Sequence, residues 1–178
     1  MNDDKRGGLA SLTLAPYIQK ATVLIGHRRK VGGNQFRHAM ATLAILIDYG
    51  EMHPVLLKAA VIHDLIEDVV DLRIDDLRAI DDDGPAVVEL VLEVTRRNQS
   101  RDEYLQHILD NGSRSAKVLK VADRISNLTD LNKDIFSADY IARRLDETNR
   151  YILPIARQVN AHMAVEVADL IERRRRLL

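Results

Sequence analysis

The sequence contains no cysteine, which excludes disulfide bonds and metal sites built from thiolates. Any bound metal ion must therefore be held by His, Asp or Glu side chains. No apolar run approaches the ~20 residues that a membrane-spanning helix needs. The stretch MNDDKRGGLA at residues 1–10 also lacks the basic-then-apolar order of a signal peptide. We therefore expect a cytoplasmic protein that does not associate with a membrane.

The chain also lacks an excess of charge of either sign, because its formal net charge is −1. This balance argues against a protein built mainly to coat nucleic acid, so we expect no nucleic-acid partner. The hydrophobic fraction of 46% and the charged fraction of 30% are ordinary for a globular protein. A length of 178 residues predicts one domain. We assign 1–10 to a flexible tail and 11–178 to that domain, and both a monomer and a homodimer remain open.

Alternating strand patterns, internal repeats and low-complexity linkers are absent, whereas apolar residues recur at three- and four-residue spacing. We therefore predict an all-α, single-domain helical bundle. The four valines in 85–96 also suit a strand, but the helical neighbours and the apolar spacing favour a helix. The predicted helices run from Ser11 to the Gly32-Gly33 break, then over 34–49, 53–69, a short piece of 71–85, 85–96, 101–110, 114–132, 137–157 and 158–176.

The stretch VIHDLIEDVV, residues 61–70, places His63, Asp64, Glu67 and Asp68 inside an aliphatic run. Burying carboxylates is costly unless they are paired, hydrogen-bonded or bound to a metal. On one continuous helix, His63 would share a face with Glu67, and Asp64 with Asp68. A divalent cation would offset the carboxylate charge there. The alternative interpretation is a helix at the rim of the protein with an acidic end in solvent.

Two further segments carry similar residues on aliphatic faces, namely His38 in FRHAMATLAIL and Asp123 in KVLKVADRISNL. A lone histidine of this kind is more often a core residue than a ligand. Together with His63-Asp64, however, these residues could supply two imidazole nitrogens and two carboxylate oxygens. That donor set suits Mn²⁺, Fe²⁺ or Zn²⁺ better than Ca²⁺ or Mg²⁺.

The order H…HD…D on separate helices resembles the HD-domain metal-dependent phosphohydrolase superfamily. HDLIED at 63–68 is similar to the HDxxED box of the alarmone hydrolases, which comprise the (p)ppGpp hydrolase domain of Rel-type enzymes and stand-alone small hydrolases. Arg29-Lys30 resembles the RK pair that precedes their first metal histidine. VADRISNL at 121–128 and ETNRYILPIA at 147–156 are similar to later segments of the same family. Several motifs in one consistent order are far more specific than any one of them.

The resemblance implies a role for each matching residue. It implies an HD-type fold and one metal ion, with Mn²⁺ expected and Fe²⁺ or Zn²⁺ as alternatives. The implied metal ligands are His38, His63, Asp64 and Asp123. Glu67 and Asp68 would position or deprotonate the attacking water, and the alternative for this pair is a helix-end charge pair. The implied substrate contacts are Arg29 and Lys30 to base and phosphates, Asn127 to the ribose, and Arg144, with Arg96, Arg97 and Arg143, to outer phosphates.

The alternatives for the substrate contacts also stay open. Arg29-Lys30 also suits a solvated basic turn at a helix end, and Asn127 also suits a helical residue that faces solvent. Arg124 is more typical of a structural ion pair with a helix neighbour. The basic run at 172–176 fits a helix C-terminus, and we assign it no function.

The sequence departs from the family around its first metal histidine. NQFRHAM stands where the family has a PY[IL]xHP segment, so Gln35 replaces a common tyrosine and Ala39 replaces a proline. The family's histidine upstream of the RK pair is also displaced, because His27 lies much closer to it. These departures fall on the side where family members bind the nucleotide base and leave the implied metal ligands intact.

The resemblance implies a small-molecule nucleotide substrate and removal of the 3′-pyrophosphate from a (p)ppGpp- or (p)ppApp-type alarmone. The ~20 residues after 157 are too few for a synthetase domain, so we expect hydrolysis without synthesis. One alternative is another HD phosphohydrolase, such as a nucleotidase that acts on nucleoside monophosphates or other phosphate esters. A second alternative is a nucleotide-binding protein without catalytic activity.

Overall fold

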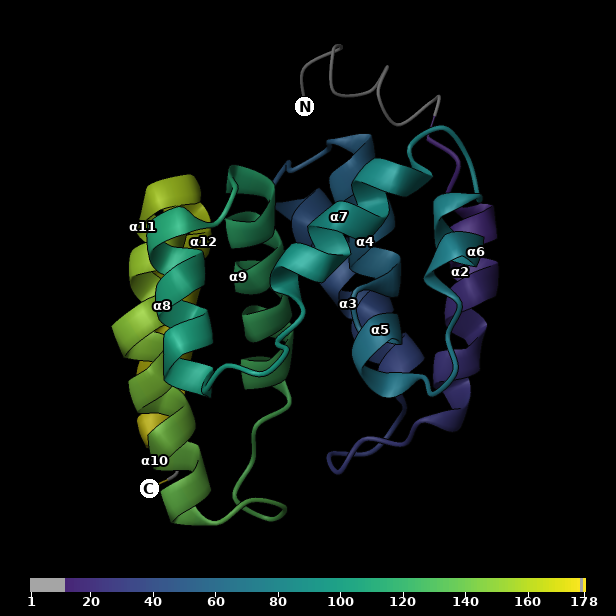
Figure 1. Cartoon of the computed structure of the whole chain (residues 1–178). Coiled ribbons are helices and arrows are strands. Elements are labelled where there is room, and N and C mark those ends of the chain that lie inside the picture. Colours follow the sequence, from purple (N-terminus) through teal and green to yellow (C-terminus); the bar gives the residue numbers. More distant parts are fainter. Residues whose placement is uncertain (1–11, 177) are drawn as a thin grey trace. The chain divides into compact units, whose positions relative to one another are not determined.

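The computed structural model describes residues 12–176 and 178, and throughout these residues the regular structure is helical (Figure 1). The described residues form no strand beyond one isolated bridge between Arg28 and Asn34. The predicted all-α fold is therefore confirmed. The predicted tail and the predicted helix start at Ser11 lie outside the described residues. Among those that are described, no helix is long and apolar enough to cross a membrane.

Chain contacts divide the described residues into two compact units, of which the first comprises 12–28 and 33–95. Its elements are α2 (Ala15–Ala21), the 3₁₀ helix η1 (Thr22–Gly26), α3 (Gln35–Asp48), α4 (Pro54–Ile62), α5 (Leu65–Asp68), α6 (Ile74–Arg78) and α7 (Gly84–Val94). Helix α4 is buried at every position from Leu56 to Ile62 and packs against α2, α3 and α7. A helix that is buried on all sides belongs in the centre of its unit. Because α4 ends at the HD pair, this core fixes the position of the motif.

Helix α3 confirms the helix predicted over 34–49, and its start is set by local sequence. The side chain of Asn34 caps the helix by accepting a hydrogen bond from the backbone N–H of Arg37 at 2.9 Å. Gly32 and Gly33 precede this cap with φ of 87° and 70°, a conformation that glycine adopts readily. The sharp turn lets the backbone N–H of Gln35 donate to the carbonyl of His27 at 2.9 Å. The first turn of α3 is therefore held by the Asn34 cap and by the hydrogen bond from Gln35 to His27.

The single helix predicted over 53–69 is wrong, because the chain leaves α4 at Ile62 and starts α5 only at Leu65. In a continuing helix the carbonyl of Ala60 would accept from the N–H of Asp64. Here the Nδ1 atom of His63 lies 2.8 Å from that same carbonyl oxygen. The imidazole thus competes with the backbone for the acceptor. The HD pair therefore lies at a helix break.

The second unit comprises residues 29–32 and 96–178. Its elements are α8 (Arg101–Asn111), α9 (Arg114–Thr129), α10 (Ala138–Glu147), the π-helix η2 (Thr148–Ile152), α11 (Leu153–Val159) and α12 (Ala161–Arg175). Helix α9 has the longest series of buried residues among them and packs against α8, α11 and α12. It carries Asp123, so the core of this unit fixes that carboxylate.

Two helices predicted in the second unit differ from the structure. The helix predicted over 137–157 contains the π-turn η2 just before Pro154. Proline has no N–H and its ring collides with the carbonyl four residues earlier, and local widening of the helix relieves this conflict. The helix predicted over 158–176 begins at Ala161, because Asn160 caps it by accepting from the N–H groups of His162 and Met163 at 3.1 and 3.2 Å.

The basic run near the end of the chain acts within the second unit. The Arg174 guanidinium donates to the carbonyl oxygens of Leu128 and Thr129 at 2.8 and 2.6 Å. These carbonyls belong to the C-terminal turn of α9, where the helix supplies no donors of its own. Arg173 and Arg176 form exposed ion pairs along α12 with Asp169 and Glu172. Arg174 therefore ties α12 to α9.

A buried lysine joins three parts of the first unit. Lys58 of α4 is 6% exposed, and its Nζ lies 2.7 Å from carboxylate oxygens of both Asp81 and Asp83. The hydroxyl of Tyr17 donates to the other oxygen of Asp81 at 2.6 Å. Burial and the neighbouring Asp81 raise the pKa of Tyr17 above its ordinary value, so it stays a donor. The network connects α2, α4 and the loop before α7.

We predict that Lys58→Met destabilises the protein by about 1–3 kcal/mol, because two carboxylates lose their shared cation. Urea unfolding followed by circular dichroism measures the change. Lys133→Met is the matched control, since Lys133 is exposed, and it should leave the unfolding midpoint unchanged. Equal midpoints for wild type and Lys58→Met would show that the network does not stabilise the fold.

Candidate active site

Three of the predicted metal ligands come together in the first unit. His38 lies on α3, His63 follows the last residue of α4, and Asp64 precedes α5. Their candidate ligand atoms all lie within 4.8 Å of one another. The carboxylate of Asp64 is 3.7 Å from Nε2 of His38 and 3.2 Å from Nε2 of His63. The two rings meet edge to face with centroids 5.4 Å apart.

The geometry of His63 shows which kind of ligand this cluster fits. Its Nδ1 is close enough to the carbonyl of Ala60 to bond with it, and a carbonyl only accepts, so Nδ1 carries the proton. In the neutral ring Nε2 is then a bare acceptor, and it faces a carboxylate oxygen of Asp64, which is also an acceptor. This nitrogen is buried and has no hydrogen-bond partner among the described residues. Two acceptors at this distance fit a cation bound between them. In addition, a histidine that binds a metal usually has its other ring nitrogen hydrogen-bonded to a carbonyl or carboxylate oxygen.

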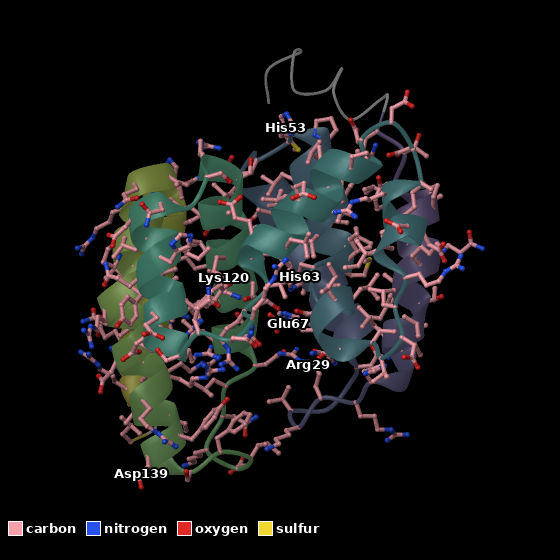
Figure 2. The ribbon with its side chains drawn as sticks, viewed as in Figure 1. Arg29, His53, His63, Glu67, Lys120 and Asp139 are labelled. Carbon is pink, nitrogen blue, oxygen red and sulfur yellow. The ribbon has the colours of Figure 1, made fainter. Side chains whose placement is uncertain are left out.

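The two predicted catalytic carboxylates follow within the next turn. The backbone N–H of Asp68 donates to the carbonyl of Asp64 at 2.9 Å, so Asp68 lies one turn beyond the HD pair. Its side chain accepts a hydrogen bond from Nε2 of Gln35 at 2.8 Å. Glu67 is exposed, and Figure 2 shows its side chain with that of His63 near the junction of α4 and α5. One carboxylate is thus held by a neighbouring helix, whereas the other reaches solvent.

Asp123, the fourth predicted ligand, lies in the second unit and is 7% exposed. Its carboxylate lies 2.9 Å from Nζ of Lys120 and accepts from Nδ2 of Asn127 at 2.5 Å. Burial alone would lower the pKa of Lys120, but the charge of Asp123 raises it above its ordinary value. Lys120 was not predicted as a site residue. Its position three residues before Asp123 in KVAD was the available signal.

Arg29 belongs to the same group of contacts. Its guanidinium donates to a carboxylate oxygen of Asp130 at 2.5 Å and to Oδ1 of Asn127 at 2.9 Å. Asn127 therefore bonds both Arg29 and Asp123, which a residue that only faces solvent would not do. Nothing in the sequence pointed to Asp130, which lies 101 positions from Arg29. Lys30, beside Arg29, is exposed.

Two of the remaining predicted arginines, Arg124 and Arg144, contact Glu147. Hydrogen bonds of Arg96 and Arg97 run to Gln99, and that of Arg143 runs to the carbonyl of Asp139. Arg124 is 3% exposed, donates to the hydroxyl of Thr148 at 2.8 Å and pairs with Glu147. Although burial alone would raise it, the pKa of Glu147 lies below its usual range because Arg124 and Arg101 favour its charged form. Arg144 lies against Glu147 at 3.3 Å and donates to the hydroxyl of Tyr140 at 3.2 Å. Arg124 thus forms a structural ion pair as expected, but its partner is not a neighbour on α9, because Glu147 lies 23 positions away on α10.

Comparisons with known proteins agree with the motifs. No family model matches the chain. A solved structure described as a metazoan ortholog of SpoT that hydrolyzes ppGpp and plays a role in starvation responses aligns with a TM-score of 0.76. The two chains are 25% identical, and the alignment covers 93% of this chain and 96% of the other. The resemblance to the alarmone hydrolases is confirmed.

A curated relative supports the same conclusion over a shorter stretch. Guanosine-3′,5′-bis(diphosphate) 3′-pyrophosphohydrolase MESH1 of Danio rerio is 30% identical over 116 residues. The match covers 60% of this chain and 61% of that relative. The aligned region thus spans less than two thirds of the relative's length.

We predict that His63→Ala lowers the affinity for Mn²⁺ at least ~10-fold, because it removes the bare imidazole nitrogen. Isothermal titration calorimetry of the chelator-treated protein measures this affinity. His53→Ala is the matched control, because His53 is an exposed histidine of the same unit whose side chain makes no capping hydrogen bond. If both variants bind Mn²⁺ as tightly as wild type, the HD pair is not a metal site.

Proposed function

We propose that the chain is a metal-dependent hydrolase that removes the 3′-pyrophosphate from (p)ppGpp- or (p)ppApp-type nucleotides. The observation that carries the proposal is the buried contact between Nε2 of His63 and the carboxylate of Asp64, which fits a cation beside His38. The names of the similar proteins supply the substrate class, since one is a guanosine-3′,5′-bis(diphosphate) 3′-pyrophosphohydrolase and the other hydrolyzes ppGpp. Mn²⁺ is the proposed ion, with Fe²⁺ or Zn²⁺ as alternatives that suit the same donors.

In the proposed reaction, the oxygen of a water molecule forms a bond to the phosphorus attached at the 3′ oxygen. The bond between that phosphorus and the 3′ oxygen breaks, pyrophosphate leaves, and the 3′ oxygen takes up a proton. A divalent cation at the His-Asp cluster would lower the pKa of a coordinated water and offset phosphate charge. Glu67 and Asp68 lie within the next turn and would position the water and accept its proton.

We further propose that Asp123 is the fourth metal ligand and that Asn127, Arg29, Lys30 and Arg144 contact the nucleotide. Support for Asp123 comes from the VADRISNL segment and from its burial on α9. Its carboxylate also lies 2.9 Å from the ammonium group of Lys120. The hydrogen bonds from Arg29 to Asn127 and from Asn127 to Asp123 link the proposed base contact, ribose contact and ligand in one series.

The proposal predicts that the Mn²⁺-loaded protein releases pyrophosphate from guanosine or adenosine nucleotides that carry a 3′-pyrophosphate. An enzyme-coupled pyrophosphate assay across ppGpp, pppGpp, ppApp and pppApp measures this. Nucleoside 5′-monophosphates belong in the same panel, and orthophosphate released from them would favour a nucleotidase instead. Absence of pyrophosphate release from all four alarmones would overturn the proposal.

Glu67→Gln should lower kcat about 100-fold or more, because the amide cannot accept the proton of the attacking water. Steady-state kinetics on the preferred nucleotide measure the change, while Mn²⁺ affinity should stay at the wild-type value. Glu172→Gln changes an equally exposed glutamate on α12 and should leave both quantities unchanged. A Glu67→Gln variant with wild-type kcat would remove the assigned role.

Asp123→Asn should weaken Mn²⁺ binding at least ~10-fold, since a neutral amide replaces the proposed anionic ligand. Calorimetric titration detects this loss without requiring turnover. Asp139→Asn provides a control at an exposed aspartate of α10, which Figure 2 labels. Unchanged Mn²⁺ affinity in Asp123→Asn would mean that the ion is held without this carboxylate.

A further inference from the structure

We infer that Gln35 is a positioning residue that holds the carboxylate of Asp68 toward the attacking water. This inference rests on the proposed function, and it assigns Gln35 to the chemistry rather than to recognition of the base. Its starting point is the 2.8 Å hydrogen bond between Nε2 of Gln35 and Oδ2 of Asp68. A carboxylate only accepts, so the amide must present its NH₂ group to it.

The hydrogen bond is one of two matched contacts between α3 and the HDLIED segment. Gln35 and His38 are three residues apart, so they lie on one face of α3. In the HDLIED segment, Asp64 and Asp68 are separated by one helical turn. His38 meets Asp64 at 3.7 Å, and Gln35 meets Asp68. One face of α3 therefore sets the position of both carboxylates, one at the metal site and one beside it.

The donor itself is held in place. Gln35 opens α3 directly after the capping residue Asn34, and its own N–H is bonded to the carbonyl of His27. The side chain is only partly exposed. A donor with a fixed backbone can hold its acceptor in one orientation, and such positioning is what a reacting group needs.

The bond also determines what remains available on Asp68. Oδ2 is engaged by Gln35, and among the described residues no other side chain is hydrogen-bonded to this carboxylate. Oδ1 therefore keeps both of its lone pairs available to water. The donor is neutral, so it orients the carboxylate without cancelling its charge, as an arginine or lysine would do. The departure at Gln35 thus replaces a family tyrosine with a residue that acts on the proposed water-positioning carboxylate.

The test compares Gln35→Met and Gln35→Glu with wild type on the preferred nucleotide. Gln35→Met keeps the length of the side chain but removes the donor, and we expect kcat to fall ~10-fold with KM within about twofold. Gln35→Glu places a second carboxylate against Asp68 and should lower kcat further. Mn²⁺ affinity and the unfolding midpoint should stay at wild-type values in Gln35→Met, because neither the metal ligands nor the core change.

Gln106→Met is the matched control. Gln106 also donates from Nε2 to an aspartate, Asp110, at 2.8 Å, but this pair is exposed on α8. Removing it should change neither kcat nor KM. The same chemical deletion is thus made once beside the proposed water and once on the surface.

The outcomes separate this inference from others. Wild-type kcat in Gln35→Met, with an active wild-type enzyme, would overturn it and leave the proposed function standing. A raised KM with unchanged kcat, or an altered preference between guanosine and adenosine nucleotides, would assign Gln35 to the base and also overturn it. A wild-type protein without activity on the whole panel would instead overturn the proposed function, and the positioning role with it.

Discussion

The contact between His63 and Asp64 is the constraint that the packing of the first unit maintains. Each residue presents an acceptor to the other at 3.2 Å inside a unit whose core is aliphatic. Such an arrangement is unfavourable without a cation between the two groups. The chain nevertheless fixes it, since Nδ1 of His63 is bonded to the carbonyl of Ala60 and α4 is buried on all sides. The fold therefore holds a geometry that costs free energy until a cation is bound, which is common at functional sites.

Other buried charges of the two units differ from this pair, because they have partners within the protein. Lys58 in the first unit and Arg124 in the second are each bonded to more than one oxygen. Their charges are compensated within the protein, so these networks are structural. The HD pair lacks that compensation, because the bare nitrogen of His63 has no partner among the described residues. The contrast marks the HD pair as the buried polar cluster that fits a cation.

Much of the fold could be predicted from sequence because local signals determine it. Caps such as Asn34 and helix breakers such as Gly32 and Gly33 mark the ends of elements within a few residues. The break between α4 and α5 could not be predicted this way. Apolar periodicity continues through 61–70, and only the bond from the imidazole of His63 to Ala60 interrupts the backbone series. Competition between a side chain and the backbone for one carbonyl does not alter the apolar periodicity of the sequence.

The residues of the candidate site also differ in how far the sequence could predict them. Some of its ionisable residues could be singled out as candidates, because a charge in an aliphatic helix stands out, as His38 and Asp123 do. Their partners could not, since Asp130 and Gln35 are ordinary polar residues far in sequence from Arg29 and Asp68. Only the fold brings these pairs together.

Gln35 shows why partners matter for function. Read as a sequence, its departure from the family tyrosine fell on the side of the nucleotide base and concerned specificity. In the structure its amide is bonded to Asp68, one turn beyond the HD pair, and His38 lies on the same face of α3. Because one N–H of the Gln35 amide is bonded to this carboxylate, only its other N–H and its carbonyl oxygen can contact a base. In the proposed function, base recognition therefore falls chiefly to other residues, and Arg29-Lys30, which resemble the RK pair of the family, are the proposed contacts.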